Sequence, residues 1–364
     1  MRIPALAAGL ATLMLAASPP VPAEARDLLV TAARPGNLYV FDAAARELVS
    51  DCALDVNITP AVIAMSPDGR IAYLLVNRWQ DVIGVDILSC ETVFMARQSE
   101  PEIRRQSIAS IAVSKDGGRV YTIRNPVRVH PDRYEVMEPE FAVFEADAGL
   151  DAQPMALHPA PRRSTIMASG GDGKVYVAGH DIVAIDPETG AIEIAIANAS
   201  WDRPLHSPPD VLAFWPIGTQ NDEFLLMYTA AVFTDESWEE IADYVWGYST
   251  VDLTSGATEV RDFASLEVLM FSGVRNPQAP NELYGVYTQL SKHDLDTNEL
   301  VARVDLPHTY YVINIASDGS EVYVGGTLDD IGIYDTTTLE RIGEIMIPSG
   351  GDMSTATLHV VRID

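Results

Sequence analysis

Short apolar segments that each end in an acidic residue recur along the chain. The acids are Asp42, Asp86, Glu145, Asp186, Asp252, Asp294 and Asp335. Turn formers follow most of them, as in residues 187–190 and 253–256, and this order is typical of a β-strand that runs into a hairpin turn. The successive separations are 44, 59, 41, 66, 42 and 41 residues. The usual unit therefore has about 40 to 45 residues, which is the period of a four-stranded propeller blade.

A second pattern lies upstream of several of these acids. Ser or Gly, followed closely by Asp-Gly, precedes an apolar strand with a central tyrosine at residues 66–74, 114–122, 170–177 and 317–324. Asp-Gly between two apolar runs is a strong hairpin signal. It predicts the turn between the first and the second strand of a blade, so that the recurring acids close the third strand.

The two ends of the chain complete one blade between them. Residues 28–31 already have the register of a second strand, and residues 357–361 follow the seventh blade with nothing else to pair with. Pairing the C-terminal strand into the first blade closes the ring and removes an open sheet edge. We therefore predict an all-β fold: a seven-bladed β-propeller that spans residues 26–364 and is closed by its C-terminal strand.

The recurring acids have a structural and a chemical explanation. An Asp side chain at a turn accepts hydrogen bonds from nearby backbone amides. Carboxylates are also ligands for hard metal ions, but these seven would lie in seven different blades, far apart. We interpret them as turn residues.

Two repeat intervals are enlarged, and both gain their length between the second and third strands. The insert in blade 3 covers residues 124–140, and the insert in blade 5 covers residues 232–246. Second-to-third-strand loops and blade-to-blade connections lie on one face of a propeller, which we call the crowned face. The remaining turns lie on the opposite face, the turn face. Long loops on one side of a rigid scaffold are typical of recognition sites, although ordinary variation in loop length is an alternative explanation.

Aromatic and charged residues concentrate in the loops predicted for the crowned face. The acidic run at residues 235–240 contains Trp238 and is either a solvated loop or a contact for a basic partner. Trp, Tyr and Arg are enriched at buried interfaces. The residues that we expect to line a substrate pocket or a partner interface are Asn77, Trp79, Arg124, Tyr134, His180, Trp201, Trp238 and Tyr310.

The first 25 residues are typical of an export signal. Arg2 is followed by an apolar run over residues 5–17 and by small residues at Ala23 and Ala25, which is the order of a cleaved signal peptide. The run is too short for a membrane anchor, and no other segment has 18 uninterrupted apolar residues. We expect a periplasmic protein from which residues 1–25 are removed and which has no membrane span.

The chain is strongly acidic, with 52 Asp and Glu against 24 Lys and Arg and a formal net charge of −28. Such a surface repels nucleic acid and anionic lipid. It either favours cationic partners or substrates, or it serves solubility alone.

The two cysteines, Cys52 and Cys90, are too few for a disulfide-dense scaffold. In an oxidising compartment two thiols are expected to pair where geometry allows. By the repeat register Cys52 lies on the outer strand of blade 1, and Cys90 lies in the turn after the third strand of blade 2. Adjacent blades would bring them together, so we predict a disulfide, with two separate buried thiols as the alternative.

The sequence has no motif of a catalytic nucleophile, a zinc site or a covalent haem. Gly-x-Ser-x-Gly, paired histidines at metal-ligand spacing and Cys-x-x-Cys-His do not occur in it. His180, in a tight loop of the crowned face, is either a structural histidine or part of a discontinuous site. We predict no catalytic residue, no metal site and no cofactor held by this chain.

Several segments together resemble a known family. The start at residues 27–32, the strand at residues 37–42, the run at residues 65–73 and the aromatic insert of blade 5 are similar to the β subunit of bacterial quinohemoprotein amine dehydrogenase. The blade motifs are generic to propellers of the YVTN type, so the length, the export signal and the loop pattern carry the specificity. The similarity covers the whole mature chain.

The resemblance implies a periplasmic heterotrimer that oxidises primary amines to aldehydes and ammonia. In that family the larger α subunit is a dihaem cytochrome c, and the small γ subunit carries a cysteine tryptophylquinone. The β subunit is a propeller that holds neither cofactor, seats the γ subunit and helps to wall the amine pocket. The resemblance therefore implies electron transfer through partner subunits, with no catalytic residue on this chain.

Three other functions fit the same features. The heavy chain of a methylamine-type dehydrogenase is also a seven-bladed ring, and its small partner carries a tryptophan tryptophylquinone. A stand-alone lactonase would hold a metal ion at the ring axis. A binding module for envelope proteins would have no redox role.

Overall fold

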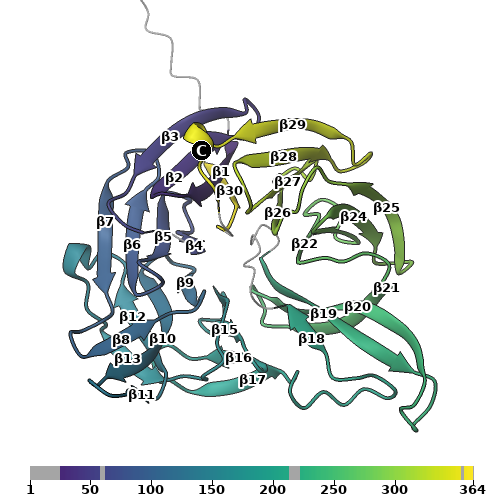
Figure 1. The fold of residues 1–364 in the computed structure, drawn as a ribbon, viewed down its shortest axis with the longest axis horizontal. Helices are drawn as coiled ribbons and strands as arrows, with labels where there is room; N and C mark the ends of the chain where they lie inside the picture. Colours follow the sequence, from purple (N-terminus) through teal and green to yellow (C-terminus); the bar gives the residue numbers. More distant parts are fainter. Residues whose placement is uncertain (1–24, 58–61, 213–221, 354–355, 364) are drawn as a thin grey trace, which may run out of the picture.

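Seven antiparallel sheets stand around a central axis in the computed structural model, which describes residues 25–57, 62–212, 222–353 and 356–363 (Figure 1). Six sheets have four strands and one has six. The predicted seven-bladed β-propeller is confirmed. The predicted signal peptide lies outside the described residues except for its last residue, Ala25. Among the described residues, no helix is long and apolar enough to cross a membrane.

The blades follow one another in sequence order, and the first-named strand of each blade lies nearest the axis. Blade 1 consists of β30 (His359–Ile363), β1 (Arg26–Ala33), β2 (Asn37–Asp42) and β3 (Glu47–Ala53). Blade 2 consists of β4 (Val62–Met65), β5 (Ile71–Val76), β6 (Asp81–Asp86) and β7 (Thr92–Arg97). Blade 3 consists of β9 (Ile111–Val113), β10 (Arg119–Val129), β12 (Glu140–Glu145) and β13 (Ala156–Pro159), with β8 (Ile103–Gln106) and β11 (Tyr134–Val136) also paired to β10.

The other four blades have four strands each. Blade 4 consists of β14 (Met167–Ser169), β15 (Val175–Ala178), β16 (Ile182–Ile185) and β17 (Ile192–Ile196). Blade 5 consists of β18 (Asp210–Leu212), β19 (Glu223–Phe233), β20 (Ile241–Asp252) and β21 (Thr258–Ser265). Blade 6 consists of β22 (Ser272–Arg275), β23 (Glu282–Val286), β24 (Gln289–Asp294) and β25 (Glu299–Asp305). Blade 7 consists of β26 (Val312–Ile315), β27 (Glu321–Gly325), β28 (Asp330–Asp335) and β29 (Arg341–Met346). Two short 3₁₀ helices, η1 (Gly149–Asp151) and η2 (Pro348–Gly350), lie in connections.

The C-terminal strand closes the ring, as the sequence predicts. β30 is the inner strand of blade 1 and pairs antiparallel with β1, so that Leu28 faces Val361. Thr31 Oγ1 donates a hydrogen bond to the carbonyl of Thr357 at 2.9 Å, and Thr357 Oγ1 accepts one from the amide of Ile63 at 3.1 Å. The end of the chain is therefore tied to blade 2 as well as to blade 1.

The core lies in the middle strands of the blades. β16 buries all four of its residues, and β2 and β27 each bury four in a row, because a neighbouring blade covers each side of the sheet. In the outer strand β25 every second residue is exposed, since its outer side meets solvent. Burying a large apolar side chain stabilises the fold by about 2–3 kcal/mol, and Phe41, Phe141 and Tyr284 are all fully buried.

The recurring acids are turn residues, as the sequence predicts. Asp186 Oδ1 accepts hydrogen bonds from the amides of Glu188 and Thr189, both at 2.9 Å. The same pair of bonds forms at Asp86, Asp252, Asp294 and Asp335, and a single such bond forms at Asp42. At Glu145 the backbone carbonyl accepts from the amide of Ala148 instead, so the acid there does not fix the turn through its side chain.

Cys52 and Cys90 are bonded to each other, with their Cα atoms 5.1 Å apart. Cys52 lies in β3, and Cys90 lies in the turn between β6 and β7. The bridge joins the outer strand of blade 1 to the turn face of blade 2.

The two inserts are mostly strands, which corrects the expectation of long loops. β11 folds back on the outer half of β10, and β8, from the connection between blades 2 and 3, pairs with the other edge of β10. In blade 5, β19 and β20 pair over their whole length, from Glu223 opposite Asp252 to Phe233 opposite Ile241. Pairing satisfies backbone groups that a long loop would leave to water. The inserts are therefore extensions of their blades.

Candidate partner-docking face

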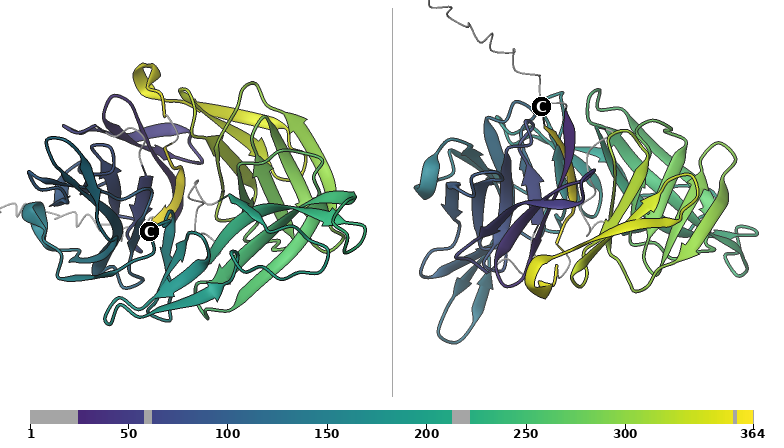
Figure 2. Two further views of the ribbon diagram at one scale, coloured as in Figure 1. Left: turned by 60° about the horizontal axis from the view of Figure 1, so that its bottom comes forward. Right: turned by 90° about the horizontal axis from the view of Figure 1, so that it is seen from above.

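The crowned face carries the two extended hairpins. We call residues 124–140 the blade 3 arm and residues 232–246 the blade 5 arm. In the right-hand view of Figure 2 the blade 3 arm projects from the side of the ring opposite the C-terminal end. The arms expose Tyr134 by 68%, Val136 by 65%, Trp238 by 49% and Tyr244 by 48%. Exposed aromatic side chains on a rigid hairpin are suited to contact with another protein.

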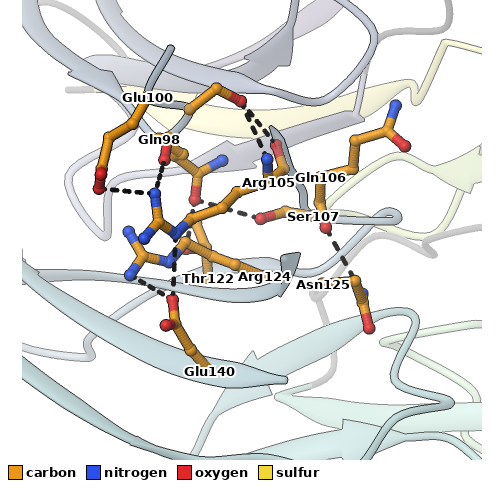
Figure 3. Close-up of polar contacts among 10 residues, drawn as sticks. Gln98, Glu100, Arg105, Gln106, Ser107, Thr122, Arg124, Asn125 and Glu140 are labelled. Carbon is orange, nitrogen blue, oxygen red and sulfur yellow. Dashed lines mark hydrogen bonds and ion pairs between the residues drawn. The ribbon is translucent and has the colours of Figure 1, made fainter. Parts of the chain in front are cut away.

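A polar network joins the root of the blade 3 arm to the connection from blade 2 (Figure 3). Arg124 Nη2 donates to Glu140 Oε2 at 2.6 Å, and Arg105 Nε lies 3.4 Å from the same oxygen. Arg105 Nη1 also contacts Glu100 Oε1 at 2.8 Å and the carbonyl of Gln98 at 3.1 Å. Arg105 and Arg124 are both buried, and burial lowers the pKa of Arg124. One carboxylate therefore holds two buried guanidinium groups.

A second network lies at the root of the blade 5 arm and has Asp262 of β21 at its centre. Both oxygens of Asp262 accept from Arg203, at 2.8 and 2.6 Å, and Tyr228 donates to Oδ1 at 2.6 Å. His206 Nε2 lies 3.0 Å from Oδ2. The Trp201 ring packs on Arg203 at 4.9 Å and edge-on against Tyr228 at 5.0 Å. This network fixes the connection between blades 4 and 5 to blade 5.

Glycine at position 247 makes the second network possible. A Cβ atom on Gly247 of β20 would lie 2.1 Å from Cζ of Tyr228, so the tyrosine ring occupies the space that any side chain would need. Tyr228 of β19 reaches across β20 to Asp262 of β21 through this gap. Burial raises the pKa of Tyr228, and so does its hydrogen bond to Asp262. The Tyr228 hydroxyl is therefore a fixed donor.

A third network surrounds Asp330 of β28, in blade 7. Asp330 accepts from Tyr310 at 2.5 Å and contacts His308 Nε2 at 2.7 Å and Arg341 Nη2 at 3.3 Å. Tyr310 is fully buried. As in blade 5, a carboxylate ties a blade-to-blade connection to its blade.

The structure brings the residues expected from the sequence to the crowned face, at different depths. Tyr134 and Trp238 lie on the arms, and Trp201 lies in the blade 5 network. Asn77 and Trp79 lie in the loop between β5 and β6, and His180 is exposed in the loop between β15 and β16. Arg124 and Tyr310 are buried. Those two residues shape the face from below, because their side chains do not reach its surface.

Two carboxylates and one cluster of aromatic rings on this face do not follow from the sequence. Glu140 and Asp262 are the central carboxylates of the first two networks. The rings of Phe271, Tyr287 and Tyr311 form a cluster with centroid distances of 4.2, 5.3 and 6.1 Å. These rings come from the connection between blades 5 and 6, the loop between β23 and β24, and the connection between blades 6 and 7. They have no common sequence pattern, so no local signal identifies them.

A cavity of about 580 Å³ lies at the axis and reaches the turn face. Inner strands β4, β9 and β14 line it mostly with apolar side chains, and Lys115 and Asp222 lie among its turn-face residues. His359 lines the cavity as well, and burial lowers its pKa to about 4. The axis therefore offers a hollow with both apolar and polar walls and a neutral imidazole at near-neutral pH.

No three or more His, Cys, Asp and Glu side chains in the described part of the chain are grouped so that they could hold a metal ion. In the three networks of the crowned face, the ionisable side chains bond to one another and hold connections in place. The arrangement is suited to binding, with two rigid arms that expose aromatic residues.

Comparison with known proteins supports the fold and does not extend to a family. No protein-family model matches the chain. No curated protein matches it either.

Solved structures with a similar fold come from diverse proteins. Dihydro-heme d1 dehydrogenase NirN, in complex with DHE, matches with 16% identity and a TM-score of 0.52, over 89% of this chain and 64% of that one. Hydrazine synthase from Kuenenia stuttgartiensis matches with 13% identity and a TM-score of 0.51, over 84% and 90% of the two chains. The β-propeller domain of Cps50 (Swd1) from Myceliophteria thermophila matches with 10% identity and a TM-score of 0.54, over 82% and 88%. This chain thus spans 64% of the length of NirN, and at such identities the likeness is one of fold: the chain is a β-propeller.

Proposed function

We propose that this chain is the propeller subunit of a periplasmic quinohemoprotein amine dehydrogenase. In this role it holds no cofactor, seats a small subunit that carries cysteine tryptophylquinone, and helps to wall the pocket for a primary amine. The c-type haems that take the electrons belong to a larger partner subunit. The complex converts the amine to an aldehyde and ammonia.

The observation that carries this proposal is the build of the crowned face. Two hairpins extend from blades 3 and 5 on the same side of the ring, and their exposed residues include Tyr134, Trp238 and Tyr244. An ion pair at each root, with a buried arginine in blade 3 and a partly exposed one in blade 5, holds the hairpins in one orientation. A rigid face with exposed aromatic residues is what a seating subunit requires. The resemblance of the sequence to the family supplies the identity of the partners.

Purification of the native complex from periplasm tests the proposal. The expected result is copurification of this chain with a large haem-staining subunit and a small quinone-staining subunit. Amine-dependent dye reduction should be lost when the gene for this chain is deleted and restored when it is returned. A chain that purifies alone, with no stained companion, would contradict the proposal.

The same experiment distinguishes the proposed function from a second candidate function. The heavy chain of a methylamine-type dehydrogenase would purify with a quinone-staining small subunit and without a haem-staining one. The lengthened blades do not discriminate between these two complexes, because both require a seating face.

A further inference from the structure

Some arginine side chains in the described part of this acidic protein have no partner. The chain has 52 Asp and Glu for 24 Lys and Arg, and most of the described cations are paired with carboxylates or carbonyls. Five arginine side chains among the described residues make no hydrogen bond or ion pair, and all five are exposed. They are Arg78, Arg97, Arg104, Arg163 and Arg362.

Four of these five lie on neighbouring segments of the crowned face, over blades 2 to 4. We call them the arginine arc: Arg78 in the loop between β5 and β6, Arg97 at the end of β7, Arg104 in β8, and Arg163 in the connection between β13 and β14. Arg362 lies in β30 and lines the axial cavity toward the turn face. The unpartnered cations are therefore concentrated on the face that also carries the arms.

Contacts between the segments hold the arc together. Gln106 Nε2, two residues after Arg104, donates to the carbonyl of Arg78 at 3.0 Å. Arg97 is the cross-strand neighbour of Asp81, but the Asp81 carboxylate accepts from Asn77 at 2.6 Å and makes no ion pair with Arg97 among the described contacts. The connection that carries Arg163 is joined to the neighbouring one by a bond from Ser110 Oγ to the carbonyl of Ser164 at 3.3 Å.

A small cavity lies beside the last member of the arc. Its volume is about 280 Å³, and its lining includes Arg163, Gly179 and His180. A Cβ atom on Gly179 would lie 2.5 Å from the carbonyl oxygen of Arg163, so glycine allows the two segments to approach closely enough to form it. A side chain from another protein that enters this cavity would meet an arginine without a partner.

We propose that the arginine arc binds carboxylates on the acidic surface of a partner subunit, which docks over blades 2 to 4. The guanidinium group is planar and matches a carboxylate with two parallel hydrogen bonds. Although this chain has many carboxylates, these arginines bind none of them, so they are available to bind carboxylates of another protein. This inference rests on the proposed function for the identity of the partner, and it adds which part of the crowned face the partner covers.

Charge favours an oriented protein partner over a polyanion. The net charge of −28 repels nucleic acid or an anionic membrane at long range. No Lys or Arg occurs between residues 204 and 260, and the blade 5 arm carries Asp235, Glu236, Glu239, Glu240 and Asp243. A carboxylate patch on a partner thus meets no cation on the blade 5 arm and four unpartnered arginines over blades 2 to 4, which sets its orientation.

The test uses the native complex after its haem-staining and quinone-staining subunits have been separated. The variant replaces all four residues of the arc by glutamine, and its affinity for each immobilised subunit is compared with that of the wild-type chain. We expect binding to one subunit to weaken at least about tenfold at low salt, with a smaller difference at high salt because ions screen the contact. Arg362→Gln is the matched control: it removes an exposed arginine without a hydrogen bond or ion pair from the other side and should leave affinity unchanged.

The outcomes separate the two proposals. If the wild-type complex forms and the fourfold variant binds both subunits as tightly as the wild-type chain, the arginine arc is not a docking site and the proposed function stands. If the wild-type chain has no such companions, both fail. Equal thermal unfolding midpoints of the variant and the wild-type chain would establish that a loss of affinity does not come from misfolding.

Discussion

Carboxylates have different partners on the two faces of the ring. On the turn face, Asp186 and Asp252 accept hydrogen bonds from amides two and three residues further along the chain. On the crowned face, Asp262 accepts from Arg203, 59 residues away, and Glu140 binds Arg124 and contacts Arg105 of a neighbouring connection. The recurring carboxylates of the turn face fix local turns, whereas the carboxylates at the roots of the arms bind side chains from distant segments.

This difference has an energetic consequence. A turn carboxylate lies near water, so its loss exposes a few amides that solvent can satisfy. A root carboxylate on the crowned face neutralises buried or half-buried guanidinium groups, and its loss leaves a charge without a partner, which is far more costly. We therefore expect the loss in the free energy of unfolding to be larger for the substitution that leaves more charge without a partner.

The largest effect is expected for Glu140→Ala. It removes the carboxylate that contacts both Arg105 and Arg124, whose side chains are only 10% and 5% exposed. We expect the free energy of unfolding to fall by about 3–5 kcal/mol, as measured by urea denaturation followed by circular dichroism. Glu188→Ala removes the exposed partner of Arg119 on the turn face and should change it by less than about 0.5 kcal/mol. Equal losses in the two variants would remove the distinction between the faces.

A smaller effect is expected for Asp262→Ala in blade 5. This substitution breaks the bonds from Arg203 and Tyr228, but Arg203 is 32% exposed and gains water in exchange. We expect a loss of about 2–3 kcal/mol in the free energy of unfolding. Tyr228→Phe removes one bond to the same carboxylate and the acceptor of one bond from Arg203, and it should cost about 1 kcal/mol. If both variants lose the same amount, the contacts of Asp262 with Arg203 and His206 contribute no net stability.

Removing a carboxylate from the turn face should lower the free energy of unfolding less, and by an amount that depends on pH. Asp86 tests this expectation. Partial burial alone raises the pKa of Asp86, but hydrogen bonds from the amides of Ser89 and Leu88 and from Arg70 outweigh it and hold the pKa below its usual range. A lowered pKa means that the ionised carboxylate stabilises the fold at pH values above about 4, the usual Asp value. That contribution is lost as the pH falls through the lower pKa of the folded state.

Asp86→Ala should therefore cost about 1 kcal/mol at neutral pH. The difference from the wild-type chain should shrink as the pH falls below about 4, in urea titrations repeated across the acid range. A difference that stays constant down to about pH 2, well below the usual Asp pKa, would show that the charge of Asp86 has no part in the stability of the turn.

The same contrast explains what can be predicted from the sequence. The turn acids and Asp-Gly hairpins are visible in it because donor and acceptor lie within three residues, so that the blade count, the register and the closing strand all follow from local patterns. The partners of Glu140 and Asp262 depend on how far β10 and β19 extend. That extension resembles a loop in the sequence, because charged residues interrupt the apolar alternation at Arg128 and Asp243.

The candidate site residues also differ in whether the sequence alone predicts their position. Trp238 and Tyr134 can be expected at the surface, because an insert between two strands of a blade projects beyond the ring. Tyr310 is a candidate for its residue type alone, and the structure shows it buried against Asp330. A tyrosine in a connection is compatible with both positions, since the hydroxyl group finds a buried carboxylate as readily as it finds water. Whether this tyrosine is buried or exposed depends on the residue that the fold places next to it.

The smallest effect on stability is expected at the tip of the blade 5 arm, for Trp238→Ala. Trp238 is half exposed and packs on Phe233 with a centroid distance of 4.9 Å. Its φ of 59° is in the left-handed region, and alanine keeps that strain whereas glycine would relieve it, so alanine isolates the side chain. We expect a loss of at most about 1 kcal/mol in the free energy of unfolding.

Trp246 lies on the same hairpin and provides the matched control. It is 2% exposed, and its indole nitrogen donates to the carbonyl of Val268 at 2.8 Å. Trp246→Ala should cost about 3–5 kcal/mol. If Trp238→Ala proved as costly as Trp246→Ala, the ring of Trp238 would be part of the fold and its exposure would not indicate a docking surface. A small loss of stability would mean that the ring has little structural role in the isolated chain, which leaves its exposed surface free to contact a partner.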